Sequence, residues 1–197
     1  MRPLPSSRST GPADTDLLAA YAAGDQSAAR ELTRRFTPRI FAVAQRMLHD
    51  PAEAEDVTQE AMLRLWRIAP NWQKNGAKVS TWLYRITSNL CVDRLRKRRE
   101  HTTDAIPEMA DDTQGVVTRL EESDRAAALS AALAALPERQ RLAIVLRHME
   151  ERSNPEIAEI METSIEAVES LLTRARRALA AELTPRRSEL GLAGEPQ

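Results

Sequence analysis

The sequence predicts an all-α protein: two small helical domains joined by a flexible acidic linker, with a helix-turn-helix in the second domain. Apolar residues recur at helical spacing in two long stretches, without strand-like alternation of useful length. Between these stretches the chain is acidic, contains Pro and Gly, and loses its periodicity. The composition agrees, because 42% hydrophobic but only 4% aromatic residues is typical of helical bundles with aliphatic cores.

Charge is distributed unevenly along the 197 residues. Residues 1–100 carry 17 Lys and Arg against 11 Asp and Glu, residues 101–125 carry 2 against 7, and the remainder carries 9 against 11. A basic front, an acidic middle and a nearly neutral back indicate separate functions. The predicted organisation is a disordered tail at 1–13, a helical domain at 14–100, the acidic linker at 101–124, a second helical domain at 125–183 and a C-terminal tail at 184–197.

Four helices are expected in the first domain, at residues 14–23, 27–48, 51–68 and 80–99. Gly24 follows the first helix as a C-terminal stop signal. Asp50 is the expected N-cap of the third helix, with Pro51 at its first position and Glu53 completing a capping box. Pro70 ends that helix, and a loop at 71–79 leads to the fourth.

The fourth helix is aromatic at its start and strongly basic at its end. Ser80 is its expected N-cap, and Leu83, Ile86 and Leu90 form its apolar side. Its polar side, spaced at i, i+4, i+8 and i+11, consists of Arg85, Asn89, Asp93 and Arg96. Amides and cations in one stripe suit contact with bases and phosphates. A solvated amphipathic helix that happens to be basic is the open alternative.

The second domain is expected to contain helices at 125–136, 137–149 and 155–161, followed by a last helix that begins near residue 163. Asn154 is the expected N-cap of the third, with Pro155 at its first position. Thr163 and Glu166 are expected to form a capping box for the last. The last two helices have helix-turn-helix spacing, which DNA-binding proteins share with other helical hairpins. The outward side of the last helix carries Glu166, Glu169, Ser170, Thr173, Arg174 and Arg177.

Several functions are disfavoured by composition. Cys91 is the only cysteine, so neither an intrachain disulfide nor a thiolate metal cluster is expected, and packing is favoured over a redox role. The three histidines are scattered, and no catalytic constellation is present, so we expect no metal, no cofactor and no enzyme activity. No apolar run approaches the roughly 20 residues that span a bilayer, and no secretory signal begins the chain. We therefore expect a cytoplasmic protein without membrane insertion.

Four sequence motifs precede the helix-turn-helix, in this order: GDQSAARELTRRF, DPAEAEDVTQEAMLRLW, VSTWLYRITSNLCVDRLRKRR and LPERQRLAIVLR. Over residues 14–182 the chain resembles bacterial RNA polymerase sigma factors of the extracytoplasmic-function (ECF) type, in the sigma-70 family. The resemblance implies a subunit that binds core RNA polymerase, recognises −35 and −10 promoter elements and aids promoter melting, in a stress response. The implied partners are the clamp of the largest polymerase subunit, promoter DNA and an anti-sigma factor.

The resemblance also implies roles for individual residues. The residues implied to bind core polymerase are Asp56, Gln59, Glu60, Leu63 and Arg67. The residues implied to contact the −10 element are Trp72, Lys74, Asn75, Lys78, Arg85, Asn89, Asp93, Arg96 and Arg99. The outward side of the last helix corresponds to the −35 reader. There Glu169 and Leu171 stand where the family often has Lys or Arg, so we expect an unusual −35 element.

Two other functions stay open. A helix-turn-helix regulator not associated with core polymerase would explain residues 150–182 but not the third and fourth helices of the first domain. A protein-binding adaptor that copies the first domain would not need the arginine run at 94–99. Run-off transcription with core polymerase distinguishes these alternatives.

Overall fold

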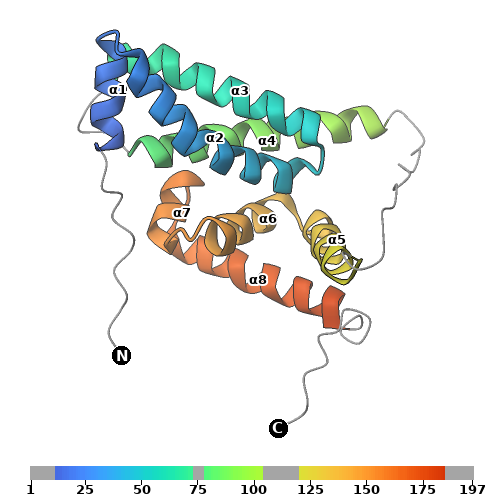
Figure 1. The fold of residues 1–197 in the computed structure, drawn as a ribbon. Coiled ribbons are helices and arrows are strands. Elements are labelled where there is room, and N and C mark those ends of the chain that lie inside the picture. The colour runs from blue at the N-terminus through green and yellow to red at the C-terminus, as the bar shows by residue number, and fades with distance from the viewer. Residues whose placement is uncertain (1–11, 73–77, 104–119, 185–197) are drawn as a thin grey trace.

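The structure is a computed structural model that describes residues 12–72, 78–103 and 120–184. Within these ranges the chain forms helices and no strand. The first group consists of α1 (Asp14–Ala22), α2 (Gln26–Leu48), α3 (Pro51–Ile68), the 3-10 turn η1 (Ala69–Asn71) and α4 (Val79–Thr103). The second group consists of α5 (Leu120–Ala135), α6 (Glu138–Ile144), the π-helical turn η2 (Val145–Met149), α7 (Asn154–Ile160) and α8 (Ile165–Leu183). Figure 1 shows the first group as one layer and the second as a layer packed beneath it.

Helix starts in the first group follow local side-chain chemistry. Asp50 accepts a hydrogen bond from the backbone N–H of Glu53 at 3.0 Å and Pro51 follows, which confirms the predicted start of α3. The Glu53 carboxylate pairs instead with Arg98 at 2.8 Å, so the second half of the predicted capping box does not form. Gly24 lies in the turn between α1 and α2 with a φ of 100°, a conformation that glycine adopts without strain.

Two predicted caps in the second group were displaced by one residue. Ser153, rather than Asn154, caps α7 in a full capping box with Glu156. Ser164, rather than Thr163, caps α8 by accepting from the backbone N–H of Ala167 at 3.2 Å. The turn explains the second shift. Glu162 adopts a left-handed φ of 49°, and the Thr163 N–H bonds back to the Ala158 carbonyl, so the extended cap conformation falls on the next residue.

Three other helix boundaries also differ from the predictions. The first turn of α4 begins at Val79, so Ser80 lies inside the helix rather than capping it, and α4 continues to Thr103. Helix α5 begins at Leu120, five residues before the predicted start, because leucine and glutamate are good helix formers and acidic residues favour a helix N-terminus. The predicted linker at 101–124 is therefore helical at both ends, and its remaining residues, 104–119, lie outside the described ranges.

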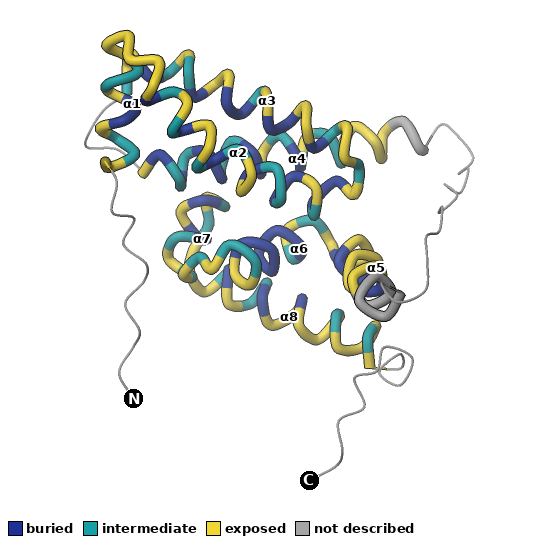
Figure 2. The backbone as a smooth tube through the Cα atoms, in the orientation of Figure 1, coloured by how far each residue is buried: buried dark blue, intermediate teal, exposed yellow. Residues whose placement is uncertain are grey.

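The described residues form two hydrophobic clusters. One lies inside the first group and includes Leu18, Leu32, Leu65 and Leu83, all fully buried. The other is shared between the groups, because the end of α2, the start of α3 and one side of α4 pack against α5, α6, α7 and α8. Figure 2 shows buried backbone on the facing sides of both layers. The two helical domains therefore pack together through a common apolar interior.

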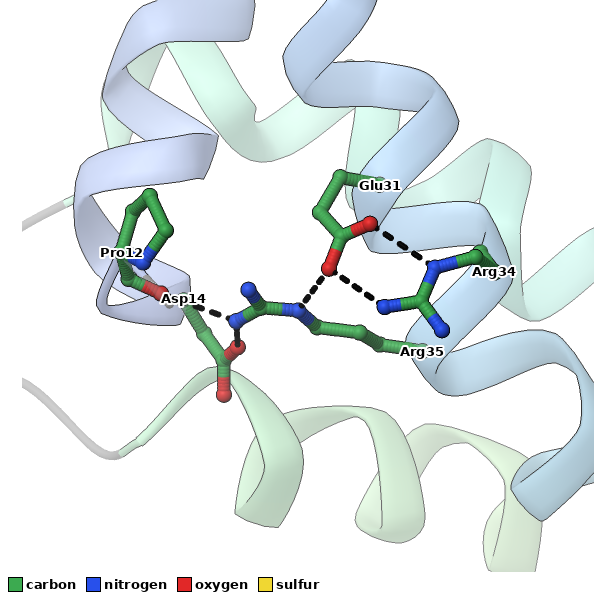
Figure 3. A network of polar contacts seen from close by, with 5 residues as sticks. All are labelled: Pro12, Asp14, Glu31, Arg34 and Arg35. Carbon is green, nitrogen blue, oxygen red and sulfur yellow. Dashed lines mark hydrogen bonds and ion pairs between the residues drawn. The ribbon is translucent and has the colours of Figure 1, made fainter. Parts of the chain in front are cut away.

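A polar network holds the short helix α1 on α2 (Figure 3). The Arg35 guanidinium donates to the Pro12 carbonyl and to Asp14, both at 2.9 Å, and to Glu31 at 2.6 Å. Arg34 donates to the same glutamate at 2.7 Å, and hydrogen bonds from both arginines lower the pKa of Glu31 to about 2. Nine residues are too few for a stable isolated helix, so α1 depends on these contacts and on its buried leucines.

The corrected cap of α8 gives a prediction about stability. Ser164→Ala removes the side-chain acceptor for the Ala167 N–H and should lower the free energy of unfolding by about 1 kcal/mol. Thr163→Ala, the matched control, should change it much less because Thr163 does not cap the helix. Urea unfolding followed by circular dichroism measures both, and a larger loss for the threonine variant would contradict this assignment.

Candidate nucleic-acid interface

The outward side of α3 presents the five residues that the sequence assigned to polymerase binding. Asp56, Gln59, Leu63 and Arg67 are exposed, and Glu60 is half-buried. Leu63 is 48% exposed, an unusual position for leucine on an otherwise polar helix face. Asp56 lies 3.5 Å from Arg94, and Glu60 accepts from Arg64 at 2.7 Å. The structure brings the five residues together on one surface with an apolar centre and charged edges, as protein interfaces commonly have.

Helix α4 is buried on a wider arc than the sequence predicted. Leu83 is fully buried, as expected, but Ile86 and Leu90 are only half-buried. Tyr84 and Cys91 are buried as well, because the second domain packs against this side of α4. Burial raises the pKa of the Cys91 thiol to about 12, which suits a packing residue.

The polar residues of α4 fall into two groups. Asn89, Asp93 and Arg96 are exposed, and Arg96 donates to Asp93 at 3.1 Å. Arg85 is half-buried and donates to Glu162 of the second domain at 3.2 Å. The predicted stripe is thus open to solvent in its middle and paired across the domain interface near its start.

The remaining predicted −10 residues lie near the two ends of α4 or outside the described ranges. Lys78 lies 3.8 Å from Glu156, and Arg99 forms an ion pair with Glu138. Lys74 and Asn75 lie outside the described residues. Within those ranges, the cations assigned to the ends of the −10 surface have acidic partners in the second domain.

Trp72, which the family resemblance assigned to the −10 element, lies with Trp66 and Trp82 in the packing of the first domain. Trp72 is half-buried and packs edge-to-face against Trp82, with ring centroids 5.8 Å apart. Trp66 is also half-buried, and its ring centroid lies 4.6 Å from that of Tyr21. All three pack against the cluster inside the first domain. In this conformation the three rings support the α1–α4 bundle.

The outward side of α8 carries the residues assigned to the −35 element. Glu166, Glu169, Thr173, Arg174 and Arg177 are exposed, and Ser170 is half-buried. Arg174 donates to the Ser170 hydroxyl at 2.7 Å, and the Thr173 hydroxyl donates to the Glu169 carbonyl at 2.8 Å.

The structure explains why α8 carries an acidic residue at position 166 and an apolar residue at position 171. Backbone and Ser164 hydrogen bonds lower the pKa of Glu166. Its negative charge lies in the first turn of α8, where the helix dipole is positive. Leu171 is half-buried and packs on the shared cluster, so an apolar side chain fits this position. Glu169 is exposed, and its carboxylate accepts a hydrogen bond from the Asn154 side-chain amide at 3.5 Å.

Sequence reasoning missed the polar contacts that join the two domains. The Tyr84 hydroxyl donates to Glu150 at 2.5 Å, and Arg152 lies over the tyrosine ring at 5.1 Å. Burial, followed by the bond to Glu150, raises the pKa of Tyr84. Arg141, 7% exposed, donates to the Met47 carbonyl of α2 at 2.5 Å. The one available signal was Arg141 itself, a cation beside the apolar run that begins at Leu142.

Other kinds of site are not found in the described ranges. They contain no group of three His, Cys, Asp or Glu side chains that could hold a metal ion. Nor do they contain a helix long and apolar enough to cross a membrane. The described surface presents exposed cationic side chains on α4 and α8, and α7 and α8 follow one another as a helix-turn-helix, an arrangement common among helical DNA-binding proteins.

Comparison with known proteins specifies this class. Residues 32–101 match sigma-70 region 2, and residues 126–179 match sigma-70 region 4. The ECF RNA polymerase sigma factor SigM of Mycobacterium tuberculosis is 35% identical over 167 residues, covering 85% of this chain and 83% of SigM. SigW of Bacillus subtilis is 33% identical over 177 residues, covering 81% of this chain and 91% of SigW. This chain belongs to the ECF sigma factors, the subunits that direct RNA polymerase to promoters.

Solved structures agree with the fold. CnrH, in complex with the cytosolic domain of CnrY, superposes with a TM-score of 0.68 at 27% identity, covering 88% of this chain and 99% of CnrH. RpoE of Bartonella quintana, in complex with the anti-sigma factor NepR, gives a TM-score of 0.62 at 24% identity, covering 79% of this chain and 96% of RpoE.

The contacts of His49 at the domain interface predict a pH dependence of stability. Its ring lies 3.0 Å from the Ser130 hydroxyl. Burial, then the charges of Arg141 and Arg98, lowers its pKa below the ordinary value of 6.5. Since the unfolded chain takes up this proton more readily, the free energy of unfolding should decrease as the pH falls below about 6.5. His49→Asn, which tolerates the left-handed backbone here, should reduce that decrease.

Urea unfolding at pH 7.5 and pH 5.5 measures this effect. Some pH dependence should remain in the variant, because burial and Arg176 also lower the pKa of His148. An identical loss of stability in wild type and variant would contradict the role of His49.

Proposed function

We propose that this sigma factor binds core polymerase through the exposed side of α3, contacts the −10 element with α4 and the loop before it, and reads the −35 element with α8. The observation that carries the proposal is the order of these surfaces on a region 2 and region 4 framework. Cations and amides on α4 suit an unpaired strand, and a helix-turn-helix suits the major groove.

The proposal includes the setting in which the chain works. It acts in the cytoplasm, in a stress response, and without catalysis of its own, since phosphodiester chemistry belongs to the core enzyme. An anti-sigma factor is a further proposed partner, because the relative CnrH was solved with a bound cytosolic domain of CnrY.

Run-off transcription tests the function directly. Core polymerase with this chain should produce defined transcripts from a library of genomic promoters, and core polymerase alone should not. A regulator that does not associate with core polymerase would give no such transcripts, and that result would refute the proposal.

The α3 surface gives a prediction about core binding. Asp56→Arg with Gln59→Ala reverses one charge and removes one amide on the five-residue surface, and should weaken core binding by roughly tenfold. Glu55→Arg provides a control, because Glu55 is an exposed residue outside that set. Fluorescence-detected core titration measures the affinities, with circular dichroism to verify helicity. Equal affinity of the double variant and the control would remove α3 from the interface.

The two DNA surfaces should respond differently to mutation. Arg96→Ala removes a cation suited to phosphate and should weaken holoenzyme binding across promoters, reducing the slope of log affinity against log salt by about 1. Thr173→Ala should instead change which −35 sequences are preferred, since base contacts carry specificity. Selection from a randomised −35 library by each holoenzyme separates the effects. The same consensus from wild type and the Thr173 variant would contradict the assignment of α8.

A further inference from the structure

Ile165, the first residue of α8, is a large apolar side chain among polar neighbours on the outward side of that helix. It is 41% exposed. The shared apolar cluster takes Val168, Leu172 and Ala175 from α8, but Ile165 is not among its described members. Single exposed apolar side chains are common on protein surfaces, so the place of Ile165 in the helix-turn-helix decides what it can contact.

The turn between α7 and α8 leaves the first turn of α8 facing outward. Glu162 adopts a left-handed φ of 49° in this turn, which brings the two helices close together in sequence. Ile157 of α7 and Val168 of α8 are fully buried in the shared cluster, on the inner side of the helix pair. In a helix-turn-helix the N-terminal residues of the second helix contact base edges in the major groove. Ile165 lies at that end of α8.

We propose that Ile165 is a specificity-determining residue of the −35 contact, whose side chain packs against the 5-methyl group of a thymine in the major groove. The inference rests on the proposed role of α8 in reading the −35 element. It adds to that role a residue that the sequence did not assign to DNA, together with the base that this residue selects.

The chemistry of the major groove leaves one partner for this side chain. Base edges present hydrogen-bond donors and acceptors there, and thymine alone among the four bases adds an apolar methyl group. Isoleucine carries neither a donor nor an acceptor in its side chain. Removing one methyl group from water corresponds to roughly a fourfold change in affinity, enough to favour thymine at one position of the element.

The residues around Ile165 suit base edges better than phosphates. Residues 165–173 contain no Lys or Arg. Glu166 and Glu169 are exposed in the same stretch, and their carboxylates repel phosphate oxygens. The exposed arginines of α8 begin at Arg174, farther along the helix. The leading end of α8 is therefore suited to specificity, while the later arginines are suited to holding the DNA backbone.

Replacement of thymine by deoxyuridine tests the proposal, because it removes the 5-methyl group and retains base pairing. Selection by the wild-type holoenzyme first defines the −35 element, and each thymine on either strand is then replaced in turn. The DNA is synthetic and unmethylated, so thymine is its only source of a 5-methyl group. Fluorescence anisotropy should show that one replacement weakens wild-type holoenzyme binding roughly fourfold. Ile165→Ala holoenzyme should bind the two DNAs equally.

Two further variants serve as a control and as a second test. Leu129→Ala removes an apolar side chain of similar exposure, 38%, from α5, and should retain the wild-type response to deoxyuridine. Ile165→Gln replaces the apolar end of the side chain by an amide and should lose the response, as Ile165→Ala does. Circular dichroism verifies the helicity of each variant, and the glutamine variant decides the question should the alanine variant unfold.

The outcomes distinguish this inference from the proposed function. Equal wild-type binding of thymine and deoxyuridine DNA at every position would overturn the Ile165 contact, and so would an undiminished response in both Ile165 variants. A selected element made of G·C pairs alone would overturn it as well. In each of these cases run-off transcription from unmodified promoters would leave the proposed function intact. Failure of the wild-type chain to support transcription with core polymerase would refute the proposed function, and the inference with it.

Discussion

The guanidinium of Arg141 lies where the two helical domains meet, and it occupies a place that few other side chains could fill. It donates to the Met47 carbonyl in the last turn of α2, and to the carbonyls of Ala134 and Leu136 at the end of α5. Carbonyls at helix C-termini lack intrahelical donors and carry partial negative charge. One buried cation therefore satisfies two helix ends from different domains. Met47, Leu136 and Leu142, beside this contact, all belong to the shared apolar cluster.

This interface determines which functional surfaces are accessible in the free chain. The α3 surface, with the exposed Leu63, lies away from the domain contact, and so does the outward side of α8. By contrast, α4 is covered on one side by the second domain, and Lys78 and Arg85 have acidic partners there. In the free chain the proposed core-binding surface is therefore open, whereas the proposed −10 surface is partly covered.

Much of the fold was predictable because it depends on local patterns. Ala54, Val57, Ala61 and Leu65 recur at helical spacing and are fully buried, and Asp50 followed by Pro51 is a strong start signal. The caps at Ser153 and Ser164 were misassigned because neighbouring polar residues compete, and only the left-handed Glu162 decides between them at the second site. At α5 the acidic residues were interpreted as linker although their propensity favours helix. Local sequence alone does not resolve such cases.

The domain packing was not predictable from the same patterns. Tyr84 and Cys91 resemble ordinary helix residues, yet both belong to the cluster shared with the second domain, where the Tyr84 hydroxyl also bonds to Glu150. The outward side predicted for the last helix is confirmed at Glu166, Glu169, Thr173, Arg174 and Arg177, since periodicity assigns helix faces. Three cations near α4, Lys78, Arg85 and Arg99, pair with glutamates of the second domain. These pairs depend on how two separate surfaces meet, and the pattern of a single helix does not predict that.

Double electron–electron resonance tests the packing of the two domains most directly. Spin labels at Glu55→Cys on α3 and Ala178→Cys on α8 occupy exposed positions, while the native Cys91 is buried and its pKa is raised to about 12. The free chain should give a single narrow distance distribution, replaced by a longer one when core polymerase and promoter DNA are bound. A broad, long distribution for the free chain, unchanged by polymerase and DNA, would contradict it.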